Sequence, residues 1–268
     1  MIPKLIVVDL DGTTLNSKGV ISKENKASLR KATEQNVEVA IATGRTFESA
    51  RDFMKDIGIT GHVVTLNGSG VRHIEAEDSL YHRYIEADLI SEIMKINGVD
   101  RVNSYFSTSE KSYVIVKERE IYNSFPFNPA LHEIDSLADL GEDGSNISKF
   151  LFSTSDNVLL ENLNQKLKEL ALEAVYPDEW CLEVTAEGVS KASALAVLAD
   201  ELGITKHDIA AIGDSENDLE MIRYAGIGIA MENAMPSVKE SAKYVTTHHN
   251  EDGVAYAVTK LLAGEWSV

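Results

Sequence analysis

The stretch near the start of the chain constrains the fold most strongly, because a continuous apolar run ends there in two carboxylates. Leu5 to Val8 are all apolar, which is typical of a strand buried on both faces of a parallel sheet. Asp9 and Asp11 follow, and Gly12 then permits a sharp turn. Open parallel sheets bind their ligands beyond the carboxyl ends of the strands. The stretch therefore predicts an α/β fold with acidic side chains at the binding edge of the sheet.

The spacing of the two acids suggests a cation. Asp9 and Asp11 are separated by one residue, so in an ideal strand their side chains point to the same face. Two carboxylates at that distance repel each other unless a cation or a proton lies between them. We expect a divalent metal site beside a reactive carboxylate. A plain Asp-Gly turn after a core strand is the alternative, and these residues alone do not decide between the two.

A second strand is expected to end at the same edge. A helix over 22–36 and a strand over 37–42 follow the acidic stretch, and a right-handed crossover makes the two strands parallel. The second strand ends in Thr43-Gly44-Arg45, where a helix beginning near Thr46 would offer free amides to an anion. A Thr-Gly turn that merely caps a helix is the simpler interpretation of these residues. Asn67, after a third strand over 62–66, is mainly a turn signal.

The second strong signal lies near the end of the chain. An apolar run over 209–212 leads into Gly213, and three polar residues follow within five positions: Asp214, Asn217 and Asp218. Mg²⁺ takes oxygen ligands from one or two carboxylates and keeps several waters. Asp214 suits direct coordination, Asp218 suits a contact through water, and Asn217 suits donation to a phosphate oxygen. Helix capping explains Ser215 and Glu216 but leaves the acids unexplained.

A lysine is expected in the first turn of another helix. Ser190 is a candidate N-cap, and Leu195, Leu198 and Leu202 form an apolar stripe behind it. Lys191 would then lie where the helix dipole mildly disfavours a cation. Its ammonium suits a phosphate or an attacking carboxylate, although most surface lysines have no such role.

The sequence pattern changes in the middle of the chain. From about residue 84 to 187, helices and strands follow one another in α+β order with no acidic motif at the strand ends, which suggests an inserted α+β domain. We therefore expect a discontinuous core over 1–83 and 188–268, built on a doubly wound parallel sheet.

Charge and cysteine content limit the partners. The 268 residues carry a formal net charge of −18, which argues against nucleic acid or an anionic membrane as a partner, since both require a basic face. A phosphorylated substrate stays compatible, because a metal ion and a few cations offset the field locally. Cys181 is the only cysteine, and no apolar run approaches the roughly 20 residues of a membrane span. A cytoplasmic protein is expected; nothing indicates an oligomeric state.

Taken together, these motifs resemble the haloacid dehalogenase superfamily of phosphohydrolases. The first motif is Asp9-Leu10-Asp11-Gly12-Thr13, and Thr43, Lys191 and the acids after residue 213 follow in family order. The inserted segment resembles the type-two cap of the Cof-like sugar-phosphatase branch. The chain departs from related sequences at Ala192, where Gly is common, and at Glu232, where Met-Gly-Asn-Ala is typical.

The resemblance implies Mg²⁺-dependent hydrolysis of a small phosphomonoester such as a sugar phosphate. It implies that Asp9 attacks phosphorus to form an aspartyl-phosphate and that Asp11 is the general acid and base. Thr43 and Lys191 would bind or neutralise the phosphoryl group, with Gly44, Arg45 and Asn217 as further contacts. The expected metal site comprises Asp9, Asp11, Asp214 and Asp218. A phosphomutase and a phospho-accepting regulator of the receiver type are the alternatives.

Overall fold

The chain forms two compact units in the structure, a computed structural model that describes residues 2–124 and 131–268. Unit 1 comprises Met1–Tyr81 and Ser190–Val268, and unit 2 comprises His82–Val189. Unit 1 is therefore built from both ends of the chain. Each unit has its own hydrophobic core.

An eight-stranded sheet forms the centre of unit 1, in the order β14-β13-β12-β1-β2-β3-β4-β5. The pairs from β14 to β3 are parallel, and β4 turns back antiparallel to β3. The strands are β1 (Leu5–Val8), β2 (Glu38–Ala42), β3 (His62–Thr65), β4 (Gly70–His73), β5 (Tyr81–His82), β12 (Ile209–Gly213), β13 (Ile227–Ala230) and β14 (Tyr244–Val245). All four side chains of β1 are buried, as its apolar run predicts.

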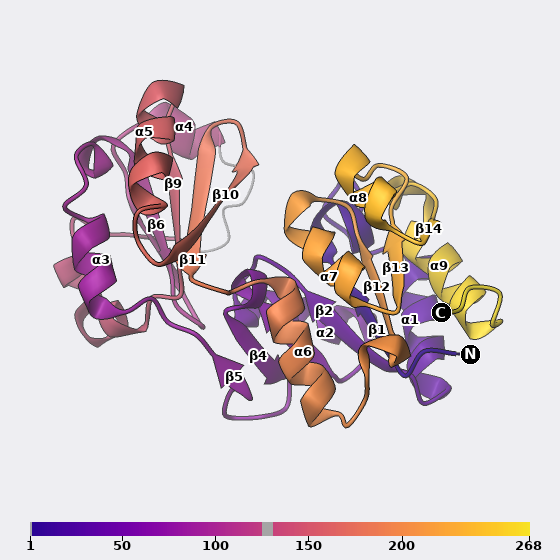
Figure 1. Ribbon diagram of the computed structural model, residues 1–268. Helices are drawn as coiled ribbons and strands as arrows, with labels where there is room; N and C mark the ends of the chain where they lie inside the picture. The colour runs from indigo at the N-terminus through magenta and orange to yellow at the C-terminus, as the bar shows by residue number, and fades with distance from the viewer. Residues whose placement is uncertain (1, 125–130) are drawn as a thin grey trace. The chain divides into compact units, whose positions relative to one another are not determined.

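Helices cover both faces of this sheet. Right-handed crossovers from β1 to β2 and from β2 to β3 place α1 and α2 on one face of the sheet. The crossover from β12 to β13 runs along the sheet in the opposite direction, so it places α7 on the other face. Helix α9 packs against α1, while α6 and α8 pack against α7 (Figure 1). The helices are α1 (Lys23–Glu34), α2 (Phe47–Ile57), α6 (Lys191–Glu201), α7 (Leu219–Tyr224), α8 (Pro236–Ser241) and α9 (Gly253–Leu262). The expected doubly wound α/β class is confirmed.

The strand order reverses direction between β1 and β12. The chain adds β2 and β3 on one side of β1, and it later adds β12, β13 and β14 on the other side. Helices on either side of such a reversal diverge to opposite faces, which leaves a crevice at the carboxyl ends of the two central strands. Residues that directly follow β1 and β12 therefore meet in this crevice.

Unit 2 is built on a six-stranded sheet in the order β10-β11-β9-β6-β7-β8. Its pairs are antiparallel except the last, β7 with β8. Phe106, Phe150, Phe152, Leu182 and Val184 are fully buried in its core. The elements are α3 (Ala87–Ile93), β6 (Asn103–Ser107), β7 (Ser112–Ile115), α4 (Arg119–Ser124), β8 (His132–Glu133), β9 (Lys149–Ser153), α5 (Asn157–Leu167), β10 (Leu172–Asp178) and β11 (Cys181–Ala186).

Unit 2 departs from the sequence expectations more than unit 1 does. Strand β6 was not predicted, because polar residues interrupt its apolar pattern, yet it lies between β9 and β7 in the sheet. The helical spacing of apolar residues predicts a helix over 158–172, but the helix ends at Leu167, because Leu172 begins β10. The sequence also predicts a polar, proline-containing stretch over 123–145, which contains β8 and the start of a 3₁₀ segment; part of it lies outside the described residues. Among the described helices, none is long and apolar enough to cross a bilayer.

His82 makes the stability of the protein sensitive to acid. Its Nε2 lies 2.6 Å from the hydroxyl of Ser148, its ring stacks on Tyr84 with centroids 4.3 Å apart, and burial lowers its pKa to about 4. In the unfolded chain a histidine titrates near pH 6.5. Below that pH the unfolded state binds a proton that the folded state does not, so the free energy of unfolding falls as pH drops from about 6.5 to about 4.

We predict that His82→Gln reduces this dependence of the free energy of unfolding on pH, as measured by urea unfolding between about pH 4 and about pH 6.5. The same change at the exposed His207 should leave it unaltered.

Candidate active site

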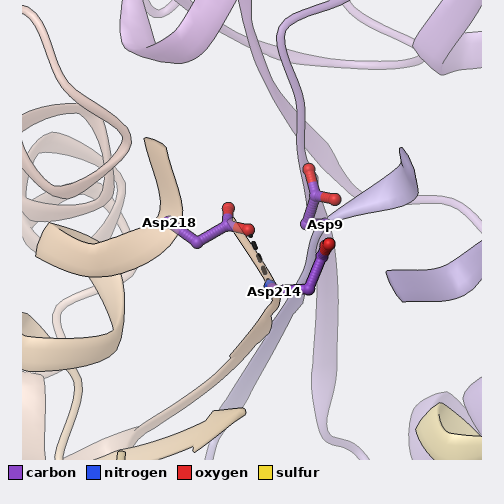
Figure 2. Close-up of side chains that lie close together, drawn as sticks. All are labelled: Asp9, Asp214 and Asp218. Atoms are coloured by element: carbon purple, nitrogen blue, oxygen red, sulfur yellow. Dashed lines mark hydrogen bonds between the residues drawn. The ribbon is translucent and has the colours of Figure 1, made fainter. Parts of the chain in front are cut away.

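Three carboxylates converge at the reversal point of the unit 1 sheet. Asp9 directly follows β1, and its N–H donates to the carbonyl of Ile212 on β12 at 3.0 Å. Asp214 directly follows β12, and Asp218 lies one turn further on. One carboxylate oxygen from each of Asp9, Asp214 and Asp218 lies within 4.8 Å of the others. Figure 2 shows these three side chains grouped together.

The turn after β1 shapes one wall of this cluster. Residues Leu10–Thr14 form a π-type turn in which Gly12 has a φ of +78°, a conformation that favours glycine. Thr13 Oγ1 donates to Asp214 Oδ1 at 2.7 Å, and Thr14 Oγ1 donates to the carbonyl of Asp9 at 2.5 Å. The side-chain amide of Asn233 donates to the carbonyl of Gly12 at 2.8 Å. These bonds fix Asp9 and Asp214 relative to each other.

Asp218 is held by the backbone of its own turn. Its Oδ2 accepts hydrogen bonds from the N–H groups of Asp214 at 2.9 Å and Ser215 at 3.1 Å, the first of which is dashed in Figure 2. The side chain is completely buried. Because these bonds and a lysine occupy both of its oxygens, Asp218 has less capacity to bind a metal directly than Asp9 or Asp214.

Lys191 is the lysine that contacts Asp218, and it lies in the first turn of α6 as the sequence predicts. Its ammonium donates to Asp9 Oδ1 at 2.7 Å and to Asp218 Oδ1 at 2.6 Å, and only 1% of the residue is exposed. Burial disfavours the charged ammonium, but the carboxylates of Asp218 and Asp9 outweigh burial and raise the pKa of Lys191. Lys191 therefore remains a cation within the cluster.

The start of α6 is placed by a close backbone approach. Gly68, in the turn after β3, has a φ of +110°, and a Cβ at this position would lie 2.1 Å from the carbonyl oxygen of Ser190. Ser190 caps the helix by accepting the N–H of Ser193 at 3.1 Å. Only a glycine allows the two segments to lie this close, so Gly68 contributes to the position of Lys191.

Burial also changes the titration of the acids. Desolvation raises the pKa of Asp9 well above its ordinary value despite the attraction of Lys191. Burial, followed by repulsion from Asp218, raises the pKa of Asp214 to about 7. Both shifts arise because negative charge is concentrated in a poorly solvated place, where a bound cation would be favourable.

The end of β2 lies beside the turn after β3. Thr43 is fully buried, its carbonyl accepts the N–H of Asn67 at 3.0 Å, and its hydroxyl accepts the N–H of Arg45 at 3.2 Å. A Cβ on Gly44 would lie 3.1 Å from Oδ1 of Asn67. Asn217 joins the same group, since its amide donates to Asn67 Oδ1 at 3.1 Å.

Comparison with known proteins assigns the family. Residues 6–258 match the haloacid dehalogenase-like hydrolases. The chain belongs to this family. It is 35% identical to the 5-amino-6-(5-phospho-D-ribitylamino)uracil phosphatase YcsE of Bacillus subtilis, over 95% of this chain and 94% of that protein. It is 30% identical to the phosphoglycolate phosphatase of Methanothermobacter thermautotrophicus, over 97% of this chain and 99% of that protein.

A solved structure supports the same assignment. A haloacid dehalogenase-like hydrolase from Bacteroides thetaiotaomicron matches 97% of this chain and 99% of its own, with a TM-score of 0.86 and 27% sequence identity. The resemblance read from the sequence motifs is thus confirmed. The expected enzyme class, a phosphatase, is confirmed as well, because relatives that span the whole chain are phosphatases.

Within this family framework, Asp11 lies apart from the three clustered carboxylates. An ideal strand would place Asp11 on the same face as Asp9, but β1 ends at Val8 and the backbone turns at Leu10. The Asp11 carboxylate instead forms an ion pair with Arg45, at 2.7 and 2.8 Å. Of the four carboxylates expected to share a metal ion, the structure brings three together, and Asp11 lies outside that group.

Two asparagines of the site were not predicted from the sequence: Asn67 was interpreted mainly as a turn residue, and Asn233 was missed. Asn67 has a φ of +56° and links the end of β3 to Asn217, but Asn-Gly is typical of any tight turn. Asn233 links the turn after β1 to His249, whose N–H donates to Asn233 Oδ1 at 3.0 Å. The position of Asn233 shortly after a parallel strand, β13, is the feature of the sequence that could have indicated a place at the site. Glu232, the departure beside it, is exposed.

We predict that Gly12→Ala disturbs the cluster itself. A Cβ at Gly12 would lie 2.4 Å from Asp214 Oδ2, so Asp214 must move, and the positive φ adds strain. Gly19→Ala is the matched control, because Gly19 has a φ of +70° with nothing within 4 Å of the new Cβ. Gly19→Ala should lower the free energy of unfolding by about 1–2 kcal/mol through backbone strain alone. Gly12→Ala should lower the free energy of unfolding further, as measured by urea unfolding. Equal effects of the two variants would contradict the contact with Asp214.

Proposed function

We propose that this phosphatase is a Mg²⁺-dependent phosphomonoester hydrolase that acts on small phosphorylated metabolites such as sugar phosphates. The observation that carries the proposal is the buried contact between Lys191 and Asp9 beside Asp214. A carboxylate whose charge is balanced in this way can approach a phosphate dianion, which an isolated buried carboxylate would repel.

The donor set fits a magnesium ion. Mg²⁺ prefers carboxylate oxygens and water, and Asp9 and Asp214 each offer an oxygen in the group that also includes Asp218. The raised pKa of Asp214 reflects burial first and repulsion from Asp218 second, and a bound divalent cation would offset both. Asp9 and Asp214 would hold the ion directly and Asp218 would hold it through water, while Asp11 would contact it at most indirectly. When bound, the ion would neutralise charge on the phosphate oxygens.

We propose a reaction in two steps on Asp9. An oxygen of Asp9 attacks phosphorus, the bond from phosphorus to the ester oxygen breaks, and Asp11 gives its proton to that departing oxygen. Asp11, now a carboxylate, takes a proton from water as that water attacks phosphorus and the bond from phosphorus to Asp9 breaks. Inorganic phosphate leaves, and Asp9 is restored. Lys191 stabilises the negative charge in both steps.

The remaining proposed contacts surround the same strand ends. Thr43 and Gly44 follow β2, and Asn217 reaches the same group through Asn67. Hydroxyl, backbone N–H and amide donors of this kind suit the oxygens of a phosphoryl group. Arg45 is the other cation here, and its role is considered below.

We interpret unit 1 as the catalytic core and unit 2 as the inserted type-two cap, with the core expected over 1–83 and 188–268 and the cap over 84–187. The division of the structure into two compact units, 1–81 with 190–268 and 82–189, supports this interpretation. We propose that unit 2 selects the organic part of the substrate. The phosphatase YcsE, which by its name acts on a phosphorylated ribityl compound, supports a polyol or sugar phosphate.

A panel of phosphorylated metabolites tests this proposal. Phosphate release should require Mg²⁺, cease with EDTA and be fastest with sugar or polyol phosphates. Repeated turnover would also separate the enzyme from a receiver-like regulator, which would give a single burst. Conversion of hexose 1-phosphates into isomers without free phosphate would instead identify a phosphomutase.

Asp9→Asn is predicted to abolish turnover while the protein stays folded. The amide is nearly the same size as the carboxylate but is a poor nucleophile toward phosphorus. Phosphate release in the presence of Mg²⁺ measures the loss, and urea unfolding checks the fold. Appreciable remaining turnover would remove Asp9 from the role of nucleophile.

Asp11→Asn is predicted to slow phosphate release by roughly 10²–10⁴, the usual contribution of general acid–base catalysis. The amide can neither give nor take the proton, so the phosphorylated enzyme should form slowly or persist. Rapid-quench measurements with ³²P-labelled substrate would detect it on Asp9. Normal rates in this variant would exclude Asp11 as the acid and base.

A further inference from the structure

Arg45 binds the carboxylate of Asp11 through two parallel hydrogen bonds. Its Nε donates to Asp11 Oδ2 at 2.8 Å, and its Nη2 donates to Asp11 Oδ1 at 2.7 Å. This fork geometry fixes the direction of a carboxylate as well as its position, which a single ammonium contact does not.

Arg45 is itself held by three parts of unit 1. Its N–H donates to the Thr43 hydroxyl at 3.2 Å, and its carbonyl accepts the N–H of Leu66 at 3.0 Å. The guanidinium carbon lies 5.3 Å from the ring centroid of Phe53 on α2, within the range of a cation–π contact. The side chain of Arg45 is 21% exposed. A residue anchored in this way can orient a more exposed neighbour.

Asp11 is the more exposed partner. It lies in the turn after β1, and its side chain is 36% exposed. Among the described residues, the hydrogen bonds that its carboxylate accepts come from Arg45. Without Arg45, the carboxylate would be free to adopt other rotamers and to point into solvent.

We infer that Arg45 is a positioning residue for Asp11, and that it aims the proton of Asp11 at the departing ester oxygen. This inference rests on the proposed function, in which Asp11 is the general acid. Each carboxylate oxygen of Asp11 has two lone pairs, so one oxygen can carry the proton while both hydrogen bonds from Arg45 remain. The two bonds then hold the carboxyl group in place and keep its proton directed at the departing oxygen.

The role differs from that of a phosphate ligand in one measurable way. A residue that acts through the general acid matters only when the departing oxygen needs a proton. An alkoxide from an alkyl phosphate is a strong base and needs one, whereas 4-nitrophenolate is a weak base and leaves without one. A residue that binds the phosphoryl group would affect both kinds of ester equally.

Arg45→Lys tests the inference with these two kinds of substrate. The lysine keeps the charge but loses the fork. We expect kcat/KM for an alkyl phosphate such as glycerol phosphate to fall at least about 10-fold more than kcat/KM for 4-nitrophenyl phosphate, as part of the acid contribution is lost. The ratio kcat/KM is the appropriate quantity, because it includes the step in which the ester bond breaks. Arg51→Lys is the matched control, because Arg51 lies on α2 with its guanidinium 5.5 Å from the Phe47 centroid, and it should leave both values unchanged.

A double variant isolates the pathway through Asp11. In an Asp11→Asn background, Arg45→Lys should no longer change the ratio between the two substrates, because the proton donor is already gone. Equal losses on both esters, or no loss on either, would overturn the inference. Phe53→Leu, which removes the ring beneath Arg45, should shift the ratio in the same direction by less, and it provides the test if Arg45→Lys unfolds.

Failure of the inference is distinguishable from failure of the proposed function. If Asp9→Asn retains turnover or Asp11→Asn has normal rates, the proposed mechanism fails whatever Arg45 does. If both behave as expected while Arg45→Lys lowers the two kcat/KM values equally, only the positioning role fails, and Arg45 is then a phosphate ligand.

Discussion

The site depends on one buried cation. Lys191 contacts Asp9 and Asp218 in a place that also contains Asp214, so that without the ammonium three carboxylates would crowd a desolvated crevice. Desolvation of a buried ion costs several kcal/mol, and losing one partner of a buried pair typically costs about 3–5 kcal/mol. The contact is therefore weak evidence for stability but strong evidence for function, because hydrophobic residues would fill the same space at lower cost.

The backbone brings the charges together through close approaches. Gly12 allows the turn after β1 to lie against Asp214, and Gly68 allows the turn after β3 to lie against the start of α6. Hydrogen bonds from Thr13 and Asn233 then connect the segments that follow β1, β12 and β13. Segments up to 221 residues apart thus define one group of side chains, while the sheet between them contributes the rigid frame.

Charge also separates the two acids of the first motif. Asp9 lies with Lys191 in the buried cluster, whereas Asp11 turns to the partly exposed Arg45. Each carboxylate has its own cation, so the two are held in different environments although one residue separates them. Two such environments support the roles proposed above for these acids, nucleophile for Asp9 and proton carrier for Asp11.

The sequence by itself determined the α/β class, the strands that flank the reversal point and the family. It also singled out the three clustered acids, but it grouped Asp11 with them, which the structure does not. Short apolar runs ending in polar residues depend only on local pattern, so β1, β2 and β12 were readable. Strand β6 was not, because its place in the sheet of unit 2 comes from pairing with β7 and β9. The pairing of Asp11 with Arg45, the link from Asn67 to Asn217 and the anchoring by Asn233 were decided by tertiary structure alone. Spacing along the chain predicts which side chains lie at the edge of the sheet. The direction in which each side chain points depends on where its strand ends and on which opposite charge lies nearest in space.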